Sequence, residues 1–433
     1  MRRITAAAAG IVVIGGVAFL AIPSSPGYRG GGSGGDASSI TWDPGVLEES
    51  VSRLPRPPLT AAESAFYRDA AAAAWKYLDA NYQSRTGLVN GSPEWHYTTT
   101  WDIGAQLLAF LAARDVGLIS TADYRQRVLK TLGTMERAQL YDRAAYNKTY
   151  STTTGSAGDG QRGATGWSAT DLGRLLIAAK VVATRDPDLA PAVERVVKRI
   201  DMSQVVKDGY LHGRMVGSSG KPWTFQEGRI GYEQYAAHGF ALWNANVGNA
   251  AAVATNASPM DVMGVNLPRD RRGLDRLNSE PFILMGLEVG LTPDMRALAE
   301  KVLQVQQARY EKTGTLTVVS EDAVAVAPHY FYYYCIIANG KPFMIDLVTP
   351  GKSLDSPRWV STKAALGWHA LMPNAYTRLA VDHVTRTRTD AGWASGVYED
   401  TGKSTGTLDI NTSAVVLEAA AYQLRGGKPL IEG

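Results

Sequence analysis

Acidic side chains recur at the start of apolar segments in this sequence, and they are of the type that carries out acid–base chemistry. The residues at six such starts are Asp102, Asp171, Glu233, Glu280, Lys363 and Thr412. Two carboxyl groups that flank one glycosidic bond can act as general acid and as base or nucleophile, which is the chemistry of glycoside hydrolysis. If the six segments begin at one place in the fold, the sequence predicts a site of this kind.

Helix capping is a complete alternative for two of these acids. Thr99 with Asp102, and Ser168 with Asp171, fit the pattern in which a hydroxyl residue caps a helix three residues before an acid. An acid near a helix N-terminus is also stabilised in its ionised form by the helix dipole. We therefore expect one of the two acids to act as base or nucleophile, while a purely structural role stays open for both.

Capping gives no account of Glu233 and Glu280. The residues three positions before them are Ile230 and Leu277, which lack a capping side chain. Tyrosines flank Glu233, and desolvation raises the pKa of a carboxyl group, as a general acid requires. We predict Glu233 as the general acid, with Glu280 and the loop residue Glu399 as further catalytic candidates.

Aromatic residues gather near the same starts and in the loops before them. Sugar rings have apolar C–H faces that pack against aromatic rings, so these residues are candidates for substrate binding. The expected binding residues are Trp101, Trp167, Trp223, Tyr232, Tyr235, Lys363, Trp368, Trp393 and Tyr398. For any single tryptophan, burial in the core is the alternative.

The elements that would position these residues are helices of two kinds. Segments 60–82, 120–140 and 292–314 are amphipathic with one charged face, which is typical of helices exposed to solvent. Six other segments carry almost no charge after their polar start, as buried helices do: 99–113, 168–182, 231–244, 277–290, 361–372 and 410–422. The alternation predicts an all-α (α/α)6 toroid with long loops at one mouth. Minor β-hairpins are expected near GTLTVVS and HYFYYYCII.

Three regions follow one another along the chain. Residues 1–23 contain Arg2 and Arg3 followed by an uncharged apolar run, which favours an uncleaved single-pass anchor over a cleaved signal peptide. Residues 24–44 form a Gly/Ser-rich linker, and residues 45–433 form one toroid domain. We expect this domain on the periplasmic side of the inner membrane, or in the periplasm or outside the cell if the segment is cleaved.

Composition excludes several other classes of protein. The formal net charge is +3 without a cluster of basic residues, which argues against nucleic acid as a partner. Cys335 is the only cysteine, so an internal disulfide and a cysteine-rich metal site are excluded. Because no metal-ligand or dinucleotide motif is present, we expect no cofactor, and a polysaccharide or oligosaccharide as the substrate.

The motifs GWSATDLGRLL, GYEQYAAHGFALW and GVYEDTGKSTGTLDINTSAVVLEAAAY resemble the bacterial family known as domain of unknown function 3131. The resemblance extends over nearly all of the chain after the linker. It implies an exported protein associated with polysaccharide metabolism, similar in outline to (α/α)6 glycoside hydrolases, including endo-β-1,2-glucanases. It carries over no catalytic residue.

Two other functions stay open. A non-catalytic carbohydrate-binding or scaffold protein of the cell envelope would keep the aromatic residues but need no pair of carboxyl groups. A polysaccharide lyase would use a tyrosine and a histidine with cations beside the uronate, which Arg229 and Lys363 would supply. The segment that suggests this third function contains Glu321, Asp322, His329 and Tyr330.

Overall fold

The computed structural model describes most of the chain after the linker. It covers residues 58–433 except 161, 162, 165, 217–219, 273, 274, 326–329, 336–340 and 348–352. The predicted anchor or signal segment and the linker therefore lie outside the described residues. Within the described part of the chain, no helix is both long enough and apolar enough to cross a bilayer.

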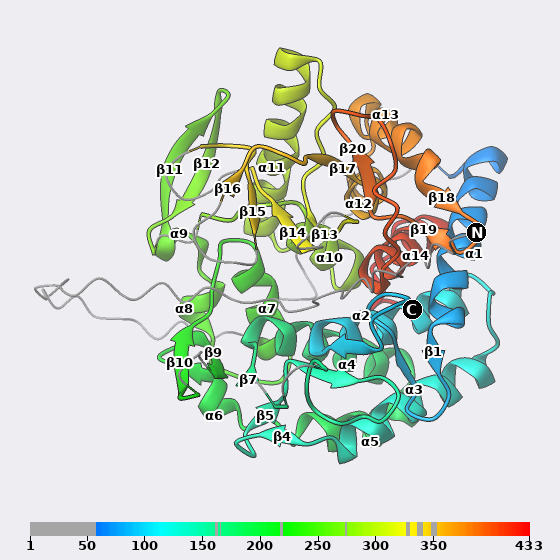
Figure 1. Cartoon of the computed structure of the whole chain (residues 1–433), viewed down its shortest axis with the longest axis vertical. Coiled ribbons are helices and arrows are strands. Elements are labelled where there is room, and N and C mark those ends of the chain that lie inside the picture. Colours follow the sequence, from blue (N-terminus) through cyan, green and yellow to red (C-terminus); the bar gives the residue numbers. More distant parts are fainter. Residues whose placement is uncertain are drawn as a thin grey trace, which may run out of the picture.

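Six helices form a closed inner ring (Figure 1). They are α2 (Thr100–Asp115), α4 (Ala169–Arg185), α7 (Tyr232–Ala241), α10 (Glu280–Glu288), α12 (Thr362–Leu371) and α14 (Ile410–Leu424). Each packs against the next one in this order, and α14 packs against α2. Most of their residues are buried all round, as the lack of charge predicts. Contacts between side chains at their starts place these starts at one end of the ring, which we call the mouth.

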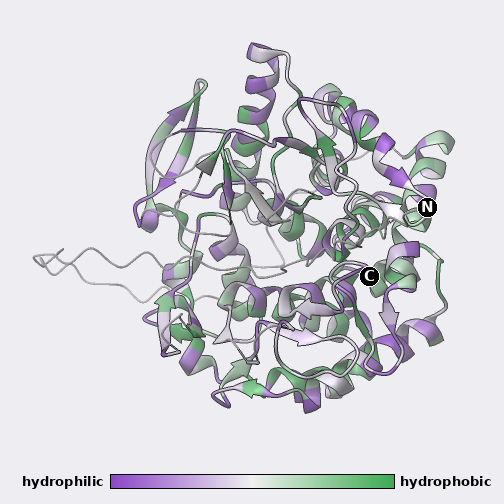
Figure 2. Ribbon diagram, viewed as in Figure 1, coloured by the Kyte–Doolittle hydropathy of each residue, from purple (hydrophilic) through white to green (hydrophobic). Residues whose placement is uncertain are grey.

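Amphipathic helices surround this ring. The outer helices are α1 (Ala61–Ala80), α3 (Thr121–Arg137), α5 (Ala190–Val197), α11 (Pro293–Thr313) and α13 (Ala375–Val384). They pack against α14, α2, α4, α10 and α12, respectively. Figure 2 shows hydrophilic and hydrophobic residues alternating along α11, as expected for a helix with one face on the core and one in solvent. The predicted (α/α)6 architecture is confirmed.

One outer position departs from the helical pattern. Between α7 and α10 the chain forms two short helices, α8 (Gly248–Ala251) and α9 (Val253–Asn256), and a hairpin of β11 (Ala257–Val262) and β12 (Val265–Asp270). Met263 and Gly264 both have positive φ angles, as a tight two-residue hairpin turn requires. The sequence analysis did not predict this hairpin, because Pro259 and Pro268 interrupt the alternation typical of strands.

Short antiparallel strands link the chain segments around the helices. The two-stranded pairs are β1 (Tyr82–Gln83) with β2 (Leu88–Val89), β3 (Tyr97–Thr99) with β6 (Thr149–Ser151), β4 (Leu140–Tyr141) with β5 (Ala145–Tyr146), β17 (Trp359–Ser361) with β20 (Gly396–Tyr398), and β18 (Arg388–Thr389) with β19 (Gly392–Trp393). Larger sheets join β7 (Gly166–Trp167), β8 (Val206–Lys207), β9 (Tyr210–Val216) and β10 (Pro222–Gln226), and join β13 (Glu321–Ala323), β14 (Tyr330–Tyr333), β15 (Ile345–Leu347) and β16 (Ser353–Leu354). The segment HYFYYYCII contains β14 as predicted, whereas GTLTVVS contains no strand. Strands β3, β7 and β17 directly precede α2, α4 and α12 and so fix where these helices begin.

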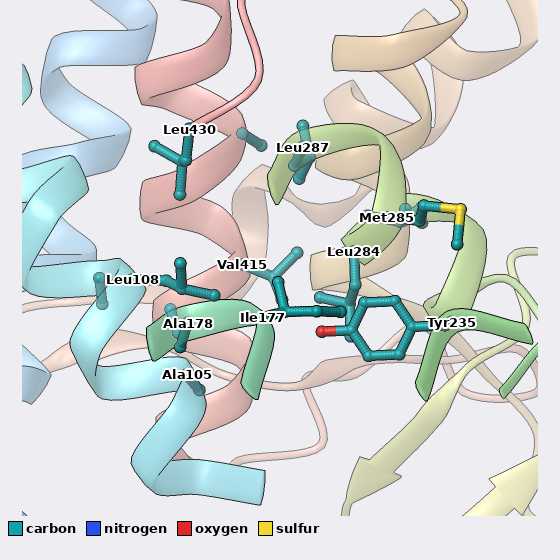
Figure 3. Packing of buried hydrophobic residues seen from close by; sticks show 14 of the residues in the cluster. Ala105, Leu108, Ile177, Ala178, Tyr235, Leu284, Met285, Leu287, Val415 and Leu430 are labelled. Atoms are coloured by element: carbon teal, nitrogen blue, oxygen red, sulfur yellow. The ribbon is translucent and has the colours of Figure 1, made fainter. Parts of the chain in front are cut away.

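Small residues allow the inner helices to pack closely. A Cβ atom on Gly173 of α4 would lie 2.5 Å from Ala236 of α7, and one on Gly239 would lie 2.1 Å from the Gly173 carbonyl oxygen. The interior between the helices is filled by apolar side chains, as Figure 3 shows for Ala105, Leu108, Ile177, Ala178, Tyr235, Leu284 and Val415. The ring is therefore a packed core.

Candidate active site at the mouth of the inner ring

Asp102 and Asp171 occupy equivalent places on neighbouring inner helices. Each is the third residue of its helix, and the backbone N–H of each donates to the hydroxyl of the cap residue, Thr99 or Ser168. The predicted capping contacts are therefore present for both acids. The two side chains differ in the hydrogen bonds that their carboxyl oxygens make.

The carboxyl group of Asp102 accepts hydrogen bonds at both oxygens. Oδ2 accepts from the backbone N–H of Thr99 at 2.9 Å, and Oδ1 accepts from Nδ2 of Asn411 at 2.7 Å. Burial raises the pKa of Asp102, while the hydrogen bonds from Thr99 and Asn411 oppose the rise because they favour the ionised form. The group is thus supplied with donors on both sides.

Asp171 shares the hydroxyl of Ser168 with a second acid, Glu227. Ser168 Oγ lies 2.6 Å from Oε1 of Glu227 and 3.0 Å from Oδ1 of Asp171. A hydroxyl has one proton to donate, and the shorter contact assigns it to Glu227, whose other oxygen accepts from the backbone N–H of Ala169. If Ser168 donates to Glu227, its contact with Asp171 is a hydrogen bond only when Asp171 carries a proton.

The electrostatics of Asp171 agree with this assignment. Burial raises its pKa to about 7, the positive charge of Lys148 opposes the rise, and the negative charge of Glu227 adds to it. Burial also lowers the pKa of Lys148 to about 8. The sequence analysis missed Glu227 and Lys148, although Glu227 lies in the long aromatic and Gly-rich loop before α7.

Glu280 lies on the other side of the mouth and is fully paired. Its Oε1 is 2.9 Å from Nζ of Lys363, and its Oε2 accepts from the hydroxyl of Tyr232 at 2.9 Å. Lys363 also lies 3.7 Å from Asp322, whose pKa is raised to about 7 by burial. Trp359 donates its indole N–H to Asp322. Lys363 therefore neutralises buried acids and is 3% exposed at its side chain, so the structure gives this predicted binding residue a structural role.

A further ion pair joins Arg229 and Glu321 at 3.1 Å. The guanidinium of Arg229 lies 4.5 Å above the ring of Tyr232, and burial raises the pKa of Glu321 to about 7. Of the residues considered for a lyase, His329 lies outside the described residues, as does the side chain of Tyr330. The cation Arg229 is already engaged by an acid of the protein, which does not favour recognition of a uronate.

Glu233 is held by Gln226 and Arg272, which lie outside the inner-ring helices. Its side chain is fully buried, its Oε1 accepts from Gln226 at 2.7 Å, and its Oε2 lies 2.6 Å from Nη1 of Arg272. Arg272 also binds Asp270, at the end of β12. Burial raises the pKa of Glu233 to about 7 against the positive charge of Arg272. Glu233 is the second residue of helix α7, which begins after Gly231. Its pairing with Arg272 gives it a structural role that the sequence did not reveal.

The loop acid Glu399 is also held by a cation. Arg309 of α11 binds both of its oxygens at 2.9 Å, and the hydroxyl of Tyr333 donates to Oε1 at 2.7 Å. This bidentate geometry is typical of a strong structural pair. It ties the loop after β20 to the outer ring and does not present Glu399 as a free acid.

The aromatic candidates separate into core and mouth residues. Trp368 and Trp393 are both 1% exposed, and the indole N–H of Trp393 donates to the backbone of Ala70. Trp167 is buried with its N–H bonded to the backbone of His212. These burials correct the predicted binding roles of the three tryptophans, because an enclosed ring has no face for a sugar.

Trp101 lies at the mouth and is only half-buried. Its ring centroid is 5.9 Å from that of Tyr232, and the guanidinium of Arg174 lies 4.8 Å from its ring. Trp223 and Tyr398 are half-buried too, on β10 and β20. By contrast Tyr235 is buried and donates to Glu288 in the interior, which corrects its predicted role in binding.

Below the mouth lies an ion cluster that the sequence analysis missed. Arg174, Glu288 and Glu418 are all fully buried, and Nη2 of Arg174 lies 3.3 Å from Glu288 and 3.6 Å from Glu418. Neither carboxyl oxygen of Glu418 has a hydrogen-bond partner among the described residues. Burial, with the charge of Glu288, raises the pKa of Glu418 well above its ordinary value against the charge of Arg174, which favours the protonated form. In the sequence, Arg174 has no marker beyond being the one basic residue in the first half of an apolar helix.

Most of the chain matches the sequence profile of one protein family. The sequence profile of a family described as protein of unknown function (DUF3131) matches residues 69–426. The chain belongs to this family. The resemblance inferred from the motifs is thereby confirmed. The matched range contains every candidate residue at the mouth of the inner ring. A search of curated proteins finds no match.

Solved structures share the fold of this DUF3131 chain at low sequence identity. A glucoamylase-like protein from Bacteroides caccae is 14% identical with a TM-score of 0.61, over 85% of this chain and 94% of its own. An endo-β-1,2-glucanase from Chitinophaga pinensis, in complex with sophorotriose and glucose, is 12% identical with a TM-score of 0.60, over 86% and 94%. The glucoamylase of Hormoconis resinae is 11% identical with a TM-score of 0.51, over 85% and 74%. These similarities establish the (α/α)6 fold and no more.

Proposed function

We propose that this DUF3131 protein is an exported glycoside hydrolase that acts on a bacterial polysaccharide or oligosaccharide, with β-glucans as the first substrates to test. The observation that carries the proposal is the pair Asp102 and Asp171. They hold the same helical position on adjacent helices, yet one accepts hydrogen bonds at both oxygens while the other is placed to keep a proton. Carboxyl groups whose environments separate their protonation states mark the acid and the base of such sites.

The mechanism that we propose is a direct displacement by water. Inverting glycosidases hold their two carboxyl groups about 6.5–9.5 Å apart to leave room for a water molecule, and this is the separation that the proposal requires of Asp102 and Asp171. In this mechanism Asp171 protonates the leaving glycosidic oxygen, and Asp102 removes a proton from the attacking water. Trp101 of α2, half-buried beside them, offers a ring on which a sugar can pack.

The fold relatives support the choice of substrate class. The Chitinophaga pinensis structure holds sophorotriose and glucose, and an endo-β-1,2-glucanase from Talaromyces funiculosus holds sophorose. Linear and cyclic β-1,2-glucans therefore head the panel of substrates. Other bacterial glucans and hexosamine polymers complete it.

Export is the part of the proposal that rests on residues 1–23. Two arginines before a long apolar run would keep the start of the chain in the cytoplasm and deliver the domain to the periplasmic side. Cell fractionation tests this step. A full-length protein that stays with the membrane after alkaline extraction supports the anchor, a shortened soluble protein supports cleavage, and a cytoplasmic protein contradicts export.

The activity test measures release of reducing ends by the purified protein across the panel. Asp171→Asn should lower kcat by about 10²–10⁴-fold, the usual contribution of a general acid, while the fold and glycan binding persist. Glu233→Gln is the matched comparison and should lose less than tenfold. The reverse result would give the acid role to Glu233. Glycan binding by all three proteins without any product would favour a carbohydrate-binding scaffold instead.

A further inference from the structure

We propose that Asn411, oriented by the buried Arg174, is a positioning residue that keeps Asp102 in its carboxylate form. The contacts run from the interior of the ring to the mouth. Arg174 Nη1 donates to Oδ1 of Asn411 at 3.0 Å, and Nδ2 of Asn411 donates to Oδ1 of Asp102 at 2.7 Å. The three residues come from α4, α14 and α2, so the contact crosses the seam where the ring closes.

The chemistry of the three groups allows one arrangement of protons. A guanidinium can only donate hydrogen bonds, so the amide oxygen of Asn411 must face Arg174. The amide NH2 then faces Asp102, and a donor in that place stabilises the ionised form of a carboxyl group. The backbone N–H of Thr99 donates to the other oxygen of Asp102, which adds to the same preference.

Arg174 is fixed well enough to impose this orientation. It is fully buried, it faces Glu288 at 3.3 Å and Glu418 at 3.6 Å, and it lies against the ring of Trp101. A buried cation that lost these partners would carry a large desolvation cost, so the side chain cannot swing away. Rotation of the Asn411 amide by half a turn would place its NH2 group against the guanidinium.

Without Asn411 the surroundings of Asp102 would favour protonation. The other ionisable groups facing it are Asp171 on α4, Asp409 at the start of α14 and Tyr77 on α1, and none of these carries a positive charge. Desolvation acts in the same direction. Arg174 is the positive charge that acts on Asp102, and Asn411 forms hydrogen bonds with both residues.

The inference deepens the proposed function, and its kinetic test rests on that function. Asn411→Leu removes the donor at similar size, and Asn411→Asp places a second carboxyl group against Asp102. Both variants should move the acidic limb of the kcat/KM profile upward by about one pH unit, which is a tenfold loss of activity below the limb. Activity above the limb should recover. Asn374→Ala is the matched control, because it removes the amide that caps the outer helix α13 and should leave the limb in place.

A second measurement does not require activity. The carboxyl ¹³C resonance of Asp102, assigned with Asp102→Asn, is titrated by NMR in the wild type, in Asn411→Leu and in Asn374→Ala. A raised midpoint in Asn411→Leu alone supports the inference even if no glycan is cleaved, in which case only the proposed function fails. An unchanged midpoint overturns the inference whatever the activity.

Discussion

On the α2 and α4 side of the mouth, neutral groups share hydrogen bonds with the acids and Lys148 adds a positive charge near Asp171, whereas on the α7, α10 and α12 side the acids form ion pairs with cations. Thr99, Asn411 and Ser168 contact the first group, and Lys363 and Arg272 contact the second. An acid neutralised by a buried cation is costly to use in proton transfer, since a change of protonation breaks the pair. An acid at the same position of a helix start can therefore have a chemical or a structural role, depending on the group that contacts it.

The largest effect should come from removing a cation on the structural side. Lys363→Met leaves Glu280 and Asp322 buried without their positive partner, and should lower the free energy of unfolding by about 3–5 kcal/mol. Denaturant unfolding measures this free energy in the wild type and in each variant. Adding Glu280→Gln should restore part of the loss, because the two residues form one unit. Arg378→Ala, in an exposed pair, should change it by less than about 1 kcal/mol; equal losses in both variants would contradict the distinction.

The chemical side should be recognised by its pH dependence. Since the pKa of Asp171 is raised to about 7, the acid is protonated below that pH and ionised above it. The value of kcat/KM should therefore fall about tenfold per pH unit above pH 7, or about 100-fold by pH 9. The profile of Glu233→Gln should keep this limb. Loss of the limb in that variant would transfer the acid role to the other side of the mouth.

The interior cluster gives a smaller effect of opposite sign. The folded state raises the pKa of Glu418, so it binds more protons than the unfolded state, and stability falls as pH rises through the interval between the two pKa values. Glu418→Gln removes this dependence and should raise the free energy of unfolding by about 1–3 kcal/mol near pH 8. Chemical denaturation at pH 5 and pH 8 compares the variants. Glu300→Gln on the exposed face of α11 should change neither value.

The smallest effect should come from an aromatic residue outside the core. Trp223 is half-buried on β10 and packs against Phe225 with ring centroids 4.8 Å apart. Trp223→Ala should weaken glycan binding by about 1 kcal/mol, or roughly fivefold, while the melting temperature stays the same. Calorimetry measures the affinity. Trp393→Ala should behave in the opposite way and destabilise the fold; a similar loss of stability in both would place Trp223 in the core as well.

The sequence predicted the ring because uncharged helices have to be buried, and this holds for all six segments. It predicted the capping contacts of Asp102 and Asp171, since those contacts are local. It could not predict the partners that decide their roles, because Asn411 is 309 positions away from Asp102 and 237 positions away from Arg174. The predictions for the tryptophans failed for the same reason. The sequence near a helix start does not show whether the ring of a tryptophan there faces the mouth or the core.

The closure of the ring between α2 and α14 also has a consequence for biogenesis. The residue that contacts Asp102 from α14 is synthesised 309 positions after Asp102. Contacts between such distant parts of a chain form late and slowly. Early segments can collapse as they emerge, but the mouth can be completed only after α14 has been synthesised. If the chain crosses a membrane as proposed, this delay would keep the precursor able to be translocated and would leave the assembly of the site to the destination compartment.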